Sequence, residues 1–173
     1  MKHYLFPLIA VICCLFMSSC GEDNPIIGLG DVEKSDLTGP WFLTYDNTLD
    51  EPTKKIWAFN ETEAAKGSIT LVDNSTLRIT TDWFFNSWTL ANKKLTLEGE
   101  NKKIYDLKQV SVLNYTAIAF GTTYVCIPST NKGLNGIRYE DDWSKGGLTR
   151  NAFWEALRKS YAEGTSVDIK LNN

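Results

Sequence analysis

Apolar and polar residues alternate with a period of two through most of residues 39–127. Such alternation is typical of strands that bury one face. It predicts strands over 40–46, 54–60, 67–72, 75–81, 84–90, 93–98, 102–109, 112–120 and 122–127. Turn residues such as Asp73-Asn74, Ala91-Asn92 and Gly99-Glu100-Asn101 separate neighbouring strands. Because these breaks are too short for parallel crossovers, we expect a mostly β fold, an antiparallel up-and-down β-barrel of about 8–10 strands.

The hydrophobic pattern changes after residue 127. Glycines interrupt residues 128–148, which predicts a long loop. Thr149 is suited to cap a helix over 150–162, and Gly164 is well placed to end it. The apolar stripe of this helix consists of Phe153, Trp154, Leu157 and Tyr161. We expect the stripe to pack against the outside of the barrel, followed by a last short strand that contains Val167, Ile169 and Leu171.

The N-terminus has the three parts of a secretory signal. Lys2 and His3 are followed by an apolar run over 4–16 and by small residues directly before Cys20. The run is shorter than the roughly 20 residues that a membrane helix needs. Ser18-Ser19-Cys20 resembles the bacterial lipobox, which implies cleavage before Cys20 and acylation of its thiol. We therefore expect a signal peptide over 1–19, an acylated cysteine with a flexible tether over 20–36, and the folded domain over 37–173.

An acylated Cys20 would anchor the protein to a membrane without spanning it. Glu22 and Asp23 follow the anchor and resemble the acidic export tags of some surface lipoproteins. We expect an outer-membrane lipoprotein that either faces the periplasm or is exposed at the cell surface.

The charge and the histidine count exclude several classes of function. The net charge of −3 argues against a nucleic-acid partner held by phosphate contacts. The single histidine, His3, leaves with the signal, so catalysis and metal binding that need histidine are excluded from the mature chain. Cys126 is then the only thiol outside the anchor, and its apolar strand predicts burial. We expect no cofactor and no metal site.

Three short motifs carry a family resemblance. They are Gly39-Pro40-Trp41, the hairpin of Trp88-Thr89-Leu90 with Leu95-Thr96-Leu97, and Tyr105-Asp106-Leu107. Together they resemble the lipocalin-like domain of bacterial outer-membrane lipoproteins over most of residues 37–173. Pro40 within the first motif and the long loop over 128–148 depart from the family pattern. The resemblance implies that Gly39 and Trp41 close one end of the barrel, beneath an arginine that is either Arg138 or Arg150.

A barrel of this size has an interior that is filled or holds one small ligand. Alternation and aromatic character select the ligand-binding candidates Trp57, Phe59, Phe84, Trp88, Tyr105 and Tyr115. Phe84 and Trp88 are expected on one face of their strand, whereas both faces of 112–120 contain apolar residues and stay open. The first hypothesis is a binding protein for a small, partly apolar ligand.

Two other functions are compatible with the sequence. A surface interaction lipoprotein, which captures glycans or nutrients or joins an outer-membrane protein, would use exposed Trp83, Tyr139 and Trp143. An enzyme would need the acidic cluster Glu140-Asp141-Asp142. Because acids in a glycine-rich loop are more often solvated, we expect no enzyme.

Overall fold

The computed structural model describes residues 27–48, 51–112, 115–126 and 140–171. The strands are β1 (Ile27–Gly30), β2 (Leu43–Tyr45), β3 (Thr53–Phe59), β4 (Ala64–Asp73), β5 (Thr76–Ala91), β6 (Lys94–Gly99), β7 (Lys103–Val112), β8 (Tyr115–Phe120), β9 (Thr123–Cys126) and β10 (Val167–Lys170). The helices are α2 (Lys34–Thr38), the 3₁₀ turn η1 (Asp46–Thr48), α3 (Glu140–Lys145) and α4 (Arg150–Glu163).

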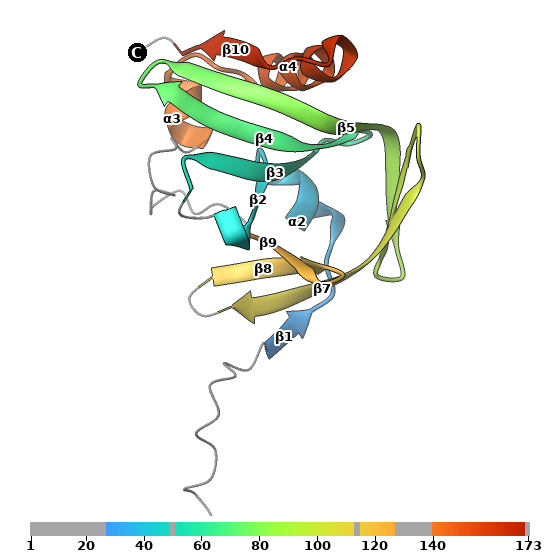
Figure 1. The fold of residues 1–173 in the computed structure, drawn as a ribbon. Coiled ribbons are helices and arrows are strands. Elements are labelled where there is room, and N and C mark those ends of the chain that lie inside the picture. Colours follow the sequence, from blue (N-terminus) through green and yellow to red (C-terminus); the bar gives the residue numbers. More distant parts are fainter. Residues whose placement is uncertain (1–26, 49–50, 113–114, 127–139, 172–173) are drawn as a thin grey trace, which may run out of the picture.

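The strands form one antiparallel sheet that closes in a ring. From β2 to β9 every strand pairs with the next strand along the chain. The ring closes where β9 pairs with β2, so that Cys126 lies opposite Thr44. Eight strands, β2 to β9, form the closed ring, and β1 adds a ninth strand to the sheet by pairing with the second half of β7. Figure 1 shows this arrangement. The predicted mostly β, antiparallel meander is therefore confirmed.

Helix α4 covers one face of the sheet, above β4 and β5 in Figure 1. The Thr149 hydroxyl accepts a hydrogen bond from the Ala152 backbone N–H at 3.1 Å and so caps its first turn. Gly164 ends it with a left-handed φ of 63°. Phe153 and Leu157 point toward the sheet and are buried. The predicted C-terminal helix, with its cap and its end, is confirmed.

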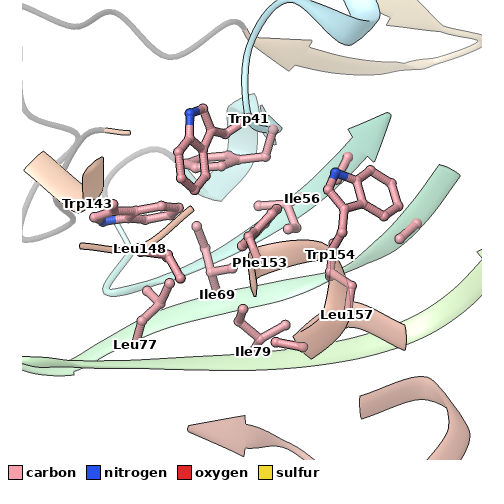
Figure 2. Packing of buried hydrophobic residues seen from close by; sticks show 14 of the residues in the cluster. Trp41, Ile56, Ile69, Leu77, Ile79, Trp143, Leu148, Phe153, Trp154 and Leu157 are labelled. Carbon is pink, nitrogen blue, oxygen red and sulfur yellow. The ribbon is translucent and has the colours of Figure 1, made fainter. Parts of the chain in front are cut away.

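The contact between α4 and the sheet is an outer hydrophobic cluster, shown in Figure 2. Its strand residues, all on the face toward α4, include Ile56, Ile69, Leu77 and Ile79. Trp143 of α3 joins them, and its ring stacks on Phe42 with a centroid distance of 5.2 Å. Burial of this much aliphatic and aromatic surface fixes α3 and α4 against the sheet.

Strand β5 is a single long strand, although the sequence predicts two strands over 75–81 and 84–90. Two β-bulges lie on β5 itself, and a third irregularity, at Val72 of β4, interrupts its pairing near the hairpin. Asp82 is the extra residue opposite Lys66 and Gly67, and Asn86 is extra opposite β6. A side chain at Gly67 would come within 2.0 Å of the Thr80 carbonyl oxygen, so only glycine fits at the first bulge. The bulges bend β5 from the face under α4 into the wall of the ring (Figure 1).

The segment that precedes the predicted domain contributes to the fold. The sequence predicts a flexible tether up to residue 36, whereas the structure places β1 and the first turn of α2 there. Val32 and Leu37 are buried inside the ring, 6% and 0% exposed. Helix α2 therefore fills one end of the ring interior, and residues 27–36 belong to the fold.

The region predicted as a long loop is partly helical. Its last part forms α3, and Leu148 is buried with Trp143 in the outer cluster. The expectation that Trp143 is exposed is wrong, since its side chain is 0% exposed. The indole is buried because Trp41, Phe42 and Phe153 surround it, a contact between segments far apart in the sequence. Residues 128–139, and with them Arg138 and Tyr139, lie outside the described residues.

Candidate functional site

The ring encloses a second hydrophobic cluster that is rich in aromatic side chains. Trp57 lies at its centre, with ring centroids 5.6 Å from Phe120, 5.8 Å from Phe59 and 6.2 Å from Phe85. Trp57 is only 1% exposed. This part of the interior is thus filled by stacked aromatic rings.

The structure brings four of the six predicted ligand-binding residues into this inner cluster. Trp57, Phe59 and Trp88 are buried against other aromatic rings, and the Trp88 indole N–H donates to the Asn60 carbonyl at 2.9 Å. Tyr105 is half-buried, with its ring 6.0 Å from Trp57. Trp57, Phe59 and Trp88 therefore form a packed wall, and Tyr105 lies at its more accessible edge.

The other two predicted residues lie elsewhere. Phe84 is wrongly placed by the sequence, because its ring packs outside the ring of strands against Trp154 and Tyr161 of α4. The bulge at Asn86 reverses the alternation between Phe84 and Trp88, so the two side chains point to opposite faces. Tyr115 begins β8, and its side chain lies outside the described part of the chain.

A lysine extends the aromatic cluster toward solvent. Lys66 on β4 pairs with Trp57 on one side and with Trp83 on the other. Its ammonium lies 4.4 Å from the ring centroid of Trp83, 5.7 Å from Tyr45 and 5.9 Å from Trp57. The Lys103 ammonium lies 4.9 Å from the same Trp83 ring. We call Tyr45, Trp57, Lys66, Trp83 and Lys103 the Lys66 cluster.

Burial shapes the electrostatics of this cluster. It lowers the pKa of Lys66 from the ordinary lysine value; Asp82 opposes this shift, and Lys55 and Lys103 add to it. Burial also raises the pKa of Tyr45 to about 12, against a smaller opposing hydrogen bond from Trp57. Both groups thus favour their uncharged forms more than they would in water.

A pocket of about 350 Å³ shares Trp83 and Lys103 with the Lys66 cluster. The other residues that line it are Asp82, Phe84, Phe85, Glu100, Asn101 and Tyr161. Phe85 also belongs to the inner cluster, whereas Phe84 and Tyr161 pack outside the ring, so residues from both faces of β5 line the pocket. Trp83 is 36% exposed and forms the accessible part of this surface.

Gly39 and Trp41, expected at the closed end, lie where α2 meets α4. The Arg150 guanidinium lies 5.8 Å from the Trp41 ring centroid. It donates hydrogen bonds to the carbonyl oxygens of Thr38 at 3.2 Å and Gly39 at 2.6 Å. Trp41 packs in the outer cluster beside Trp143, so this group of residues joins the helices and lines no part of the Lys66 cluster.

Comparisons of the chain with family models, curated proteins and solved structures gave no match. Within the described residues, no helix is both long and apolar enough to cross a membrane. Cys20, the predicted lipidation site, precedes the described residues. Glu140, Asp141 and Asp142 lie in α3, and their side chains are outside the described part. The thiol of Cys126 is buried in β9, as its apolar strand predicts.

The sequence does not indicate most of the Lys66 cluster as a site. It predicts Trp83 only as an exposed residue of an interaction surface, and it assigns no role to Lys66 or Tyr45. A signal was present for Lys66, which stands in an otherwise small and apolar strand beside Ala64 and Ala65. The contact with Trp83 depends on the bulge at Asp82, which alternation alone does not reveal.

Proposed function

We propose that this chain is a lipid-anchored, lipocalin-like β-barrel protein that binds a small, partly apolar ligand at the Lys66 cluster. The observation that carries the proposal is the pocket of about 350 Å³, which is lined by exposed Trp83 and by Phe85 of the inner cluster. Ligand pockets combine apolar walls with a few polar groups that fix orientation. Here Lys103 lines the pocket, and Lys66 lies beside it with its ammonium 4.4 Å from the centroid of the shared Trp83 ring.

The arrangement of the elements supports a lipocalin-like barrel. The strands of the ring follow one another in chain order, a short helix fills one end, and a C-terminal helix packs outside. The Arg150 guanidinium beside Trp41 supports Arg150 as the arginine of the contact that the resemblance implies, although Trp41 packs in the outer cluster and not inside the ring. The anchor at Cys20 and the outer-membrane location rest on the N-terminal sequence.

An apolar fluorescent probe tests the binding function. The full chain carrying Cys20→Ala, purified without detergent, would be titrated with N-phenyl-1-naphthylamine. We expect saturable binding that Trp83→Ala weakens about tenfold, because the variant removes the accessible aromatic face of the pocket. Native mass spectrometry of the same preparation would show whether a small molecule is carried through purification.

Ile104→Ala provides the matched control. Ile104 lies on β7 between Lys103 and Tyr105, is 57% exposed, and lines neither the pocket nor the inner cluster. Probe affinity should be unchanged in this variant. Equal loss in both variants, or no binding to the parent chain, would contradict the proposed function.

A further inference from the structure

We propose that the ligand is an organic anion whose charged group pairs with Lys66 and whose apolar body packs against Trp83. This inference rests on the binding function proposed above and specifies the chemistry of the ligand.

Aromatic rings surround the Lys66 ammonium. It contacts the rings of Tyr45, Trp57 and Trp83 and is half-buried among them. Among the residues that the structure describes, no carboxylate lies within ion-pair distance of it. Aromatic faces replace only part of the hydration that a buried cation loses. An incoming anion would supply the missing counter-charge.

More basic than acidic groups act on Lys66. Lys55 and Lys103 are near enough to lower its pKa, and Asp82 is the one acid that opposes them among the groups acting on it. A second carboxylate, Glu100, lines the pocket with Asp82 and Lys103 and acts on Tyr161, not on Lys66. Around Lys66 itself, the ammonium groups of Lys55, Lys66 and Lys103 outnumber the Asp82 carboxylate. This balance favours an anion over a cation.

Trp83 offers an accessible aromatic surface beside the lysines. It is 36% exposed, and its ring meets the Phe85 ring in a T-shaped contact with centroids 6.3 Å apart. Trp83 lines the pocket, and its ring centroid lies 4.9 Å from the Lys103 ammonium. A flat or acyl body could cover Trp83 while its charged end reaches the lysines. Charge-assisted hydrogen bonds would then orient the ligand.

Two probes that share one aromatic body separate the charge from the apolar contact. These are 8-anilino-1-naphthalenesulfonate, which is anionic, and N-phenyl-1-naphthylamine, which lacks the sulfonate. Both would be titrated into the full Cys20→Ala chain and into Lys66→Met, Lys66→Arg and Lys103→Met variants of it. Lys108→Met is the matched control, since Lys108 is an exposed lysine on β7 outside the pocket and the cluster.

Lys66→Met should weaken binding of the sulfonate about tenfold or more, while binding of the neutral probe changes less than about twofold. Lys66→Arg should retain most of the sulfonate affinity, Lys103→Met should lose part of it, and Lys108→Met should match the parent. If Lys66→Met does not fold, salt dependence in the parent decides the question. High salt should then weaken binding of the sulfonate and leave the affinity for the neutral probe unchanged.

Two further results would each overturn the inference, in distinguishable ways. If both probes bind and neither Lys66→Met nor salt separates them, the site is apolar only, and the proposed binding function stands without the anion. If neither probe binds to the parent chain, the proposed function fails and the inference fails with it.

Discussion

At the scale of single residues, Gly67 shows how one position fixes the shape of the ring. A Cβ there would lie 2.0 Å from the Thr80 carbonyl oxygen and 2.9 Å from the Thr81 Cα, both backbone atoms that cannot move independently. We predict that Gly67→Ala lowers the free energy of unfolding by about 1–3 kcal/mol or more. Ser68→Ala, on the same strand, should change it by less than about 0.5 kcal/mol. Urea unfolding followed by tryptophan fluorescence measures both, and equal small effects would contradict the prediction.

Asp73 is a second residue whose local contacts have a measurable consequence. Its carboxylate accepts hydrogen bonds from the Ser75 backbone N–H at 2.7 Å and from the Thr76 hydroxyl at 2.8 Å. These bonds lower the pKa of Asp73 from 3.8 to about 2. Because the folded pKa lies below the unfolded pKa, the stabilisation is present above pH 4 and is lost as the pH falls toward 2. As the pH falls from 4 to 2, the free energy of unfolding should decrease less in Asp73→Asn than in the parent chain. A pKa near 4 for the Asp73 carboxyl, measured by NMR, would contradict this prediction.

At the scale of secondary structure, the sequence predicts those elements whose position and ends depend on local sequence pattern alone. Alternation predicted the antiparallel strands, and Thr149 and Gly164 predicted both ends of α4. The division of β5 and the face of Phe84 could not be predicted, since each depends on one extra residue that matters only against a partner strand. The burial of Trp143 likewise arises from contacts with segments distant in sequence.

The N-terminal elements give a test at this scale. A residue in a flexible tether tolerates a charge, whereas Val32 is 6% exposed inside the ring. We predict that Val32→Asp lowers the free energy of unfolding by about 2–4 kcal/mol, because the charge would be buried among apolar side chains. Asp31→Ala, which removes only the exposed ion pair with Lys93, should cost about 1 kcal/mol or less. A Val32→Asp chain as stable as the parent would restore the tether interpretation.

At the scale of the whole molecule, the short strand β2 closes the ring and pairs with each of its two neighbours at only two positions. Strands β2 and β9 pair at Thr44 with Cys126 and at Tyr45 with Val125, and at no other described position. Strands β4 and β5, by contrast, pair along nearly their whole shared length and also lie under α4. Local opening follows the weakest set of contacts in a fold. We therefore expect the β2–β9 pairing to open before the β4–β5 side.

The buried thiol of Cys126 reports on that opening. In a chain with Cys13→Ser, Cys14→Ser and Cys20→Ala, we predict that a thiol reagent reacts with Cys126 at an opening free energy below that of global unfolding. The matched control adds Cys126→Ala and Ala65→Cys, which places the thiol on β4, 1% exposed in the native chain. The control thiol should react only on global unfolding, measured by urea titration. If both thiols react with the same free energy, the ring unfolds as one cooperative unit, and the prediction of an early opening at β2 and β9 is contradicted.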